Sequence, residues 1–124
     1  MLIRFRIQPL DPDSGHAVGV LVAAHTLRDE GDLTVREHEE LRLALTWFNE
    51  NLFVPAILEN KEHRRAISWF RPNAHDAIRR MWDLKRILDA HGHHVDVIRC
   101  VDPGTIVHED EHQVIAKPLK GQRF

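Results

Sequence analysis

The apolar and polar positions at the start of the chain predict one strand followed by a buried helix. Residues 2–7 alternate apolar side chains with arginine, which is typical of a strand that buries one face. Residues 14–30 are apolar on nearly every side, which predicts a helix buried centrally or at a subunit interface, capped by Ser14 and stopped by Gly31. Because glycine and valine weaken a helix, a strand across residues 18–22 is the alternative.

A second helix is the clearest amphipathic element of the sequence. Thr34 and Glu37 have the spacing of a capping box, in which each side chain accepts a hydrogen bond from the other residue's backbone. Apolar residues then recur at helical spacing until Val54-Pro55, where the proline ends the helix. The short link between the first two helices predicts an antiparallel helical hairpin. The more polar residues 56–65 indicate a surface connection.

The rest of the chain predicts a strand, a crossover helix, a second strand and a final hairpin. Asn73 and Asp76 indicate the start of this helix, and Gly92 indicates its end. We expect the two strands that flank the helix to lie parallel through a right-handed crossover. The five elements are predicted over residues 66–70, 73–92, 95–101, 105–109 and 112–117.

Together these elements predict one α+β domain over residues 1–124. A mixed sheet of four to five strands is covered by about three helices, in the order β-α-α-β-α-β-β-β. In the final hairpin, a two-residue turn at Asp110-Glu111 would set Val107 opposite Val114 and Ile106 opposite Ile115.

Composition narrows the class of protein without indicating a reaction. Of the 124 residues, 43% are hydrophobic and 29% are charged, which is an ordinary globular mixture. A net charge of -2 disfavours nucleic acid and anionic membranes as partners. The single cysteine excludes an internal disulfide. With no signal-like or membrane-spanning apolar run, we expect a soluble cytoplasmic protein.

Ten histidines make a metal site the first chemistry to consider. His108 and His112 flank the acidic stretch Glu109-Asp110-Glu111, and His91 and His93 follow the third predicted helix. The simpler interpretation is a solvated acidic hairpin tip for the first group and histidines favoured by a helix C-terminus for the second, and neither spacing matches a zinc signature. We therefore expect no cofactor, with a divalent metal such as zinc as the alternative.

Lys85 is a lysine inside the apolar arc of the third predicted helix. In the simpler interpretation, its stem covers apolar surface while its ammonium reaches water. In the functional interpretation, the ammonium reaches an acidic or phosphate ligand and rests against Glu109 or Glu111. The candidate ligand-binding residues are therefore Lys85, Glu109, Glu111 and Gln113.

Three stretches of the sequence carry a resemblance that covers most of the chain. They are Trp47-Phe48-Asn49-Glu50-Asn51-Leu52 before a proline, Ser68-Trp69-Phe70 before a helix, and Glu109-Asp110-Glu111-x-Gln113 in the final hairpin. Together they resemble a group of small, uncharacterised bacterial proteins. The resemblance implies a free-standing bacterial protein and brings no activity, ligand or catalytic residue with it.

Two functions fit these patterns. The first is a non-enzymatic interaction or regulatory module that binds a protein or a small ligand. Its nearly all-apolar first helix predicts a homodimer, because such a surface needs a partner. The second is a small metal-assisted hydrolase that uses His108, Glu109, Glu111 and His112, with His91 or His93 as a further ligand.

Overall fold

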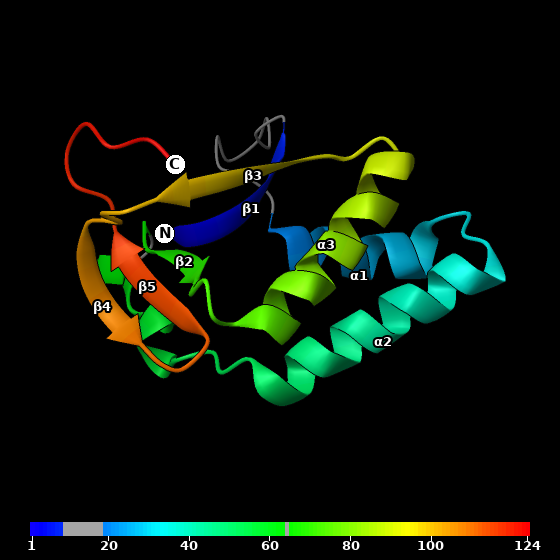
Figure 1. Ribbon diagram of the computed structural model, residues 1–124, viewed down its shortest axis with the longest axis horizontal. Helices are drawn as coiled ribbons and strands as arrows, with labels where there is room; N and C mark the ends of the chain where they lie inside the picture. The colour runs from blue at the N-terminus through cyan, green and yellow to red at the C-terminus, as the bar shows by residue number, and fades with distance from the viewer. Residues whose placement is uncertain (9–18, 64) are drawn as a thin grey trace. The chain divides into compact units, whose positions relative to one another are not determined.

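The computed structural model describes residues 1–8, 19–63 and 65–124 (Figure 1). Within these residues the helices and strands follow the predicted order, with two short 3-10 helices inserted before the second strand. The elements are β1 (Leu2–Gln8), α1 (Val20–Glu30), α2 (Val35–Asn51), η1 (Ala56–Glu59), η2 (Lys61–His63), β2 (Ile67–Phe70), α3 (His75–Ala90), β3 (His94–Cys100), β4 (Thr105–Glu109) and β5 (Gln113–Lys117). The predicted α+β class is therefore confirmed.

The five strands form one sheet in the order β3-β1-β2-β5-β4 (Figure 1). The sheet is antiparallel rather than mixed, because β1 lies between the two strands that flank α3. β2 and β3 each run antiparallel to β1, so they share a direction but are not neighbours. The alternation in residues 2–7 predicted a strand correctly but gave no indication of where that strand would insert.

Two compact units divide the chain. The hairpin unit comprises Met1–Arg4, Leu52–Ile78 and Ile98–Phe124, and it contains β2, β4 and β5. The helical unit comprises Phe5–Asn51 and Arg79–Val97, and it contains α1, α2 and most of α3. Within the described residues, no helix is long and apolar enough to cross a membrane.

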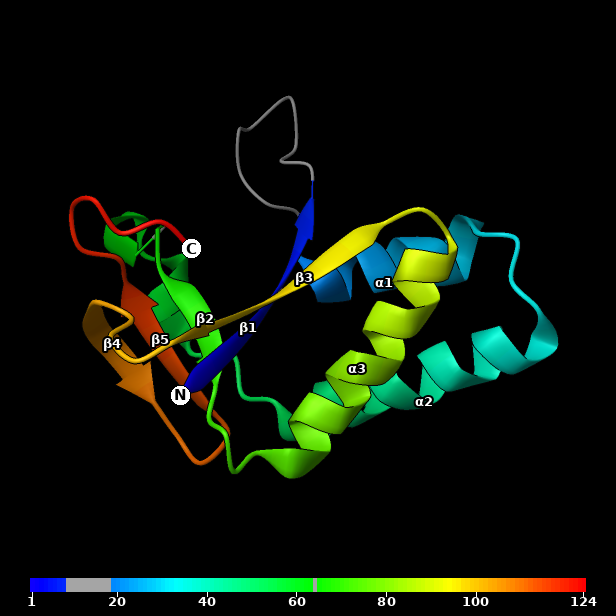
Figure 2. The same ribbon diagram turned by 45° about the horizontal axis from the view of Figure 1, so that its top comes forward.

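In the helical unit, α1 and α2 form the antiparallel hairpin that the sequence predicted (Figure 2). The described part of α1 buries one stripe, Val20, Ala24 and Leu27, whereas Val22 on another side is 62% exposed. The alternative strand is thus wrong from Val20 onward. Ser14, the predicted cap, lies outside the described residues.

The start of α2 confirms the predicted capping box. The Glu37 N–H donates to Thr34 Oγ1 at 3.1 Å, and the Thr34 N–H donates to Glu37 Oε1 at 3.0 Å. Because both groups are donors that a helix leaves unpaired, this exchange fixes the helix start. The helix ends at Asn51, a few residues before the proline that was expected to stop it.

The third helix begins at His75 rather than Asn73, within the usual uncertainty of a helix boundary. Its end confirms the role predicted for Gly92, which adopts φ 86°. The His93 N–H then reaches back to the Leu88 carbonyl at 2.9 Å, which is the long bond of a Schellman motif. Glycine is favoured here because other residues rarely adopt a positive φ.

In the hairpin unit, β2, β5 and β4 lie side by side (Figure 2). Gln113 and Lys117 point to the same side of β5, because they lie four positions apart on that strand. Both side chains contact residues 52–63, which therefore cover that face of β5. The Gln113 amide contacts the Phe53 carbonyl, and Lys117 Nζ donates to the Glu62 carbonyl at 3.1 Å. These contacts attach the segment that follows α2 to the hairpin.

Candidate functional site

The turn between β4 and β5 is organised by the side chain of Asp110. Its Oδ1 accepts the N–H of His112 at 2.9 Å and the N–H of Gln113 at 3.1 Å, while its own N–H donates to the Gln113 carbonyl at 2.9 Å. An aspartate that accepts backbone donors two and three residues ahead substitutes for the Asn-Gly sequence that tight hairpins favour. The turn residues are therefore Glu111 and His112.

This turn corrects the predicted pairing of β4 with β5. The expected partners of Val114 and Ile115 were Val107 and Ile106, but the structure sets His108 opposite Ile115. A bulge between Ile106 and His108 then shifts the register by one residue. The prediction was wrong because it placed the turn one residue too early and had no signal for the bulge.

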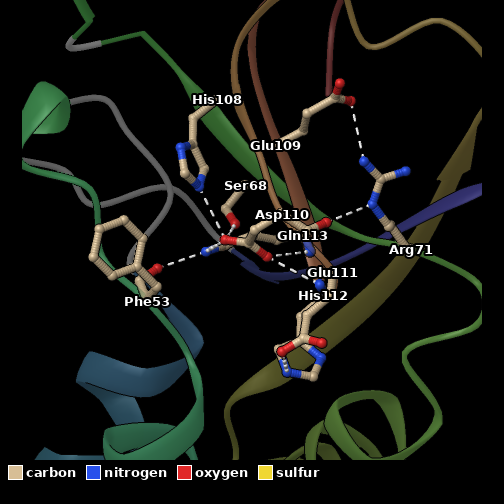
Figure 3. A network of polar contacts seen from close by, with 9 residues as sticks. All are labelled: Phe53, Ser68, Arg71, His108, Glu109, Asp110, Glu111, His112 and Gln113. Atoms are coloured by element: carbon tan, nitrogen blue, oxygen red, sulfur yellow. Dashed lines mark hydrogen bonds and ion pairs between the residues drawn. The ribbon is translucent and has the colours of Figure 1, made fainter.

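The second carboxylate oxygen of Asp110 joins two further side chains (Figure 3). His108 Nε2 lies 2.9 Å from Oδ2, and Gln113 Nε2 donates to the same oxygen at 3.1 Å. Partial burial acts to raise the pKa of Asp110. The hydrogen bonds from His108, the backbone and Gln113 outweigh it and lower the pKa from 3.8 to about 2. Asp110 is therefore a fixed negative charge in the physiological range.

Gln113 is a buried polar residue, with 2% of its surface exposed. Its Oε1 accepts the Ser68 hydroxyl at 2.8 Å, and its Nε2 donates to the Phe53 carbonyl at 2.5 Å as well as to Asp110. A buried amide is stable when its donors and acceptors are paired in this way. Gln113 was predicted to bind a ligand, whereas its amide here links β2, the hairpin turn and the segment after α2.

Arg71 holds the other side of the turn. Its Nε donates to the Asp110 carbonyl at 2.7 Å, and its guanidinium pairs with the Glu109 carboxylate at 3.0 Å. Its backbone N–H also donates to the His112 carbonyl at 2.9 Å. Of the predicted ligand carboxylates, Glu109 is thus in an ion pair. Glu111 points outward, with 84% of its side chain exposed.

The four histidines predicted as metal ligands lie in separate surroundings. His108 pairs with Asp110, His112 lies 3.3 Å from Glu111, and His91 lies 2.8 Å from Glu37 in the helical unit. His93 is exposed. Among residues 1–8, 19–63 and 65–124, no three His, Cys, Asp or Glu side chains are grouped to hold a metal ion.

Lys85 belongs to the helical unit and has partners within that unit. Its ammonium donates to the Asp89 carboxylate at 2.7 Å and to the Val95 carbonyl at 2.7 Å. Asp89 in turn accepts the Val95 N–H at 2.9 Å. The carboxylate that Lys85 contacts is thus one helical turn away, and the pair attaches the start of β3 to the end of α3.

The feature that the sequence analysis missed is the exposed apolar segment beside the turn. Phe53 is 61% exposed and Val54 is 72% exposed, although the Phe53 carbonyl is held by the buried Gln113. The Phe53 ring lies 5.7 Å from the His108 ring, between centroids, at a tilt of 42°. The signal was present in the sequence as seven consecutive apolar residues, 52–58, of which 52–55 were interpreted as the end of a helix and 56–58 as part of a polar surface connection.

Comparisons of the chain with protein-family models, with curated proteins and with solved structures returned no match.

Proposed function

We propose that this chain is a non-enzymatic protein-binding module and that residues 52–58, with the adjoining hairpin turn, form its contact surface. The observation that supports the proposal is an exposed apolar segment whose backbone accepts a hydrogen bond from the buried side chain of Gln113. Phe53, Val54 and Ile57 are 61%, 72% and 38% exposed, in a run that contains no polar residue. A run of exposed apolar residues is unfavourable in a folded chain unless it meets a partner.

Fixing such a segment favours binding, because it lowers the conformational entropy that a partner must remove. Gln113 holds the Phe53 carbonyl, and the His108 ring lies against the Phe53 ring. Exposed aromatic side chains on a rigid base are typical of the residues that contribute most to protein association. Meanwhile the polar groups of the turn contact one another, which suits a scaffold better than a reactive centre.

The predicted homodimer through the first helix has less support than this surface. Val20, Ala24 and Leu27 are buried within the helical unit, so the described part of α1 does not present an apolar surface on every side. Self-association stays a prediction, and sedimentation of the chain at micromolar concentration tests it.

Selection from a phage-displayed library of random twelve-residue peptides tests the proposed surface. The folded chain is the bait, and peptides that also bind the Phe53→Ser, Val54→Ser double variant are removed. We expect peptides that bind the natural chain with micromolar Kd and bind the double variant about tenfold or more weakly. A loss of this size is typical when a central aromatic contact residue is removed.

Val35→Ser is the matched control, because Val35 is 90% exposed on α2 in the helical unit. That variant should bind the selected peptides like the natural chain. Circular dichroism and thermal unfolding should show that all three chains are folded. A library that yields no peptide dependent on Phe53 and Val54 would contradict the proposed function.

A further inference from the structure

We infer that the partner segment is basic, presenting arginine or lysine beside apolar side chains to the surface formed by Phe53 and the hairpin turn. This inference rests on the proposed function and names the chemistry of its partner. The exposed apolar segment is the docking surface, and the charge around it selects what occupies it.

The turn next to Phe53 carries an excess of negative charge. Glu109, Asp110 and Glu111 are consecutive, and the guanidinium of Arg71 pairs with Glu109. Asp110 receives its hydrogen bonds from groups that carry no fixed positive charge: two backbone N–H groups, the Gln113 amide and an imidazole nitrogen. Glu111 projects with 84% of its side chain exposed.

Two side chains, those of Gln113 and His108, each contact both Asp110, which carries the negative charge, and Phe53, which carries the aromatic ring. Gln113 Nε2 donates both to the Phe53 carbonyl and to Asp110 Oδ2 (Figure 3). The His108 ring lies beside the Phe53 ring and also pairs with Asp110. Gln113 therefore joins the backbone of Phe53 to the Asp110 carboxylate by hydrogen bonds, and the contact with the His108 ring places the Phe53 side chain near that carboxylate.

A cationic side chain complements both features at once. A guanidinium or ammonium that lies over the face of an aromatic ring is attracted by the ring's quadrupole, and a nearby carboxylate adds to that attraction. The stem of an arginine or lysine would cover the apolar surface of Val54 and Ile57. A phosphate-bearing or acidic partner would instead meet like charge at Glu111, which opposes association.

The peptides selected for dependence on Phe53 and Val54 provide the test. We expect this set to be enriched in arginine and lysine relative to the starting library. For the tightest peptide, replacing each arginine or lysine with glutamine should weaken Kd about tenfold or more, as measured by fluorescence anisotropy. Glu111→Gln should weaken Kd by about threefold, and raising the salt from 50 to 300 mM should weaken binding further.

Glu30→Gln is the matched control, because Glu30 is an exposed carboxylate on α1 in the helical unit. It should leave the Kd unchanged. Selected peptides that need Phe53 but are neutral or acidic, or that bind independently of salt, would overturn this inference and leave the proposed function standing. A dimer that Val54→Asp dissociates would also overturn it, since a second copy would then cover the surface. No Phe53-dependent peptide at all would overturn both.

Discussion

Asp110→Asn removes the negative charge of Asp110 from the hairpin turn while keeping a side chain of nearly the same shape. Asparagine keeps one oxygen that can accept the backbone N–H groups of His112 and Gln113. Its amide nitrogen, however, faces the donors that contact Oδ2 in the natural chain, His108 Nε2 and Gln113 Nε2. Both donors lose this acceptor: His108 can change tautomer and accept from the new amide, whereas Gln113 Nε2 must rotate or lose this partner. We expect the variant to fold with a smaller free energy of unfolding at neutral pH.

The lowered pKa of Asp110 sets the magnitude of this loss. A folded value of about 2 against the ordinary 3.8 corresponds to an upper bound of roughly 2 kcal/mol in the free energy of unfolding. Because 25% of the side chain is exposed, water screens part of the interaction. The expected loss for Asp110→Asn is therefore about 1 to 2 kcal/mol.

The sign of the pH dependence follows from the direction of the shift. A pKa that folding lowers contributes stability that is complete above the unfolded value of 3.8 and is lost as the pH falls through the folded value of about 2. At pH 3 roughly half of the contribution should remain. The difference between the natural chain and Asp110→Asn should therefore shrink between pH 5 and pH 3.

Urea unfolding at pH 7, 5 and 3 and constant ionic strength measures this difference. The comparison of pH 5 with pH 3 is the most informative, because the contribution of Asp110 should be nearly complete at pH 5 and about half lost at pH 3. Glu111→Gln is the control, since that exposed side chain should change stability by less than about 0.5 kcal/mol. Equal stability of Asp110→Asn and the natural chain at pH 5 would refute the reasoning. So would a deficit that is as large at pH 3 as at pH 5, since it would then not arise from charge.

Two further predictions concern the scaffold, and thermal or urea unfolding checks both. Gly104→Ala should lower the free energy of unfolding by roughly 3 kcal/mol or more, and Gly92→Ala should lower it by only about 1 kcal/mol. Both glycines have positive φ, but a Cβ at Gly104 would lie 2.1 Å from the Lys117 carbonyl oxygen whereas one at Gly92 meets open space. Equal losses would contradict that difference. Lys85→Met should lower the free energy of unfolding by about 1 kcal/mol, because an exposed carboxylate and a half-buried carbonyl lose their donor. An unchanged stability would show that these contacts contribute little.

Local patterns in the sequence predicted the elements well because their causes are local. The capping box at Thr34 and Glu37 and the stop at Gly92 depend on residues a few positions apart, and both formed as expected. The place of β1 in the sheet could not be predicted in this way. Its alternation specifies a buried face, but which strands lie beside it is decided by contacts across the whole chain.

The candidate site was predicted in part, and for a related reason. The sequence identified the stretch from His108 to Gln113 and predicted for its charged groups either a solvated hairpin tip or a ligand site. In the structure Asp110, which was not among the predicted site residues, joins His108 and Gln113. The exposed surface beside them is contributed by Phe53, which is sixty residues distant from Gln113 in the chain. No spacing rule relates positions that meet only through a tertiary hydrogen bond.

Asp110 both stabilises the hairpin turn through its hydrogen bonds and contributes negative electrostatic potential at the surface of the hairpin. A carboxylate that paired with arginine would stabilise the turn equally well, but its charge would be compensated. Here the donors are two backbone N–H groups, an amide and an imidazole nitrogen, so the turn closes while the negative charge is retained beside Phe53. Replacing Glu111 should therefore change the salt dependence of binding without changing stability, whereas replacing Asp110 should change both.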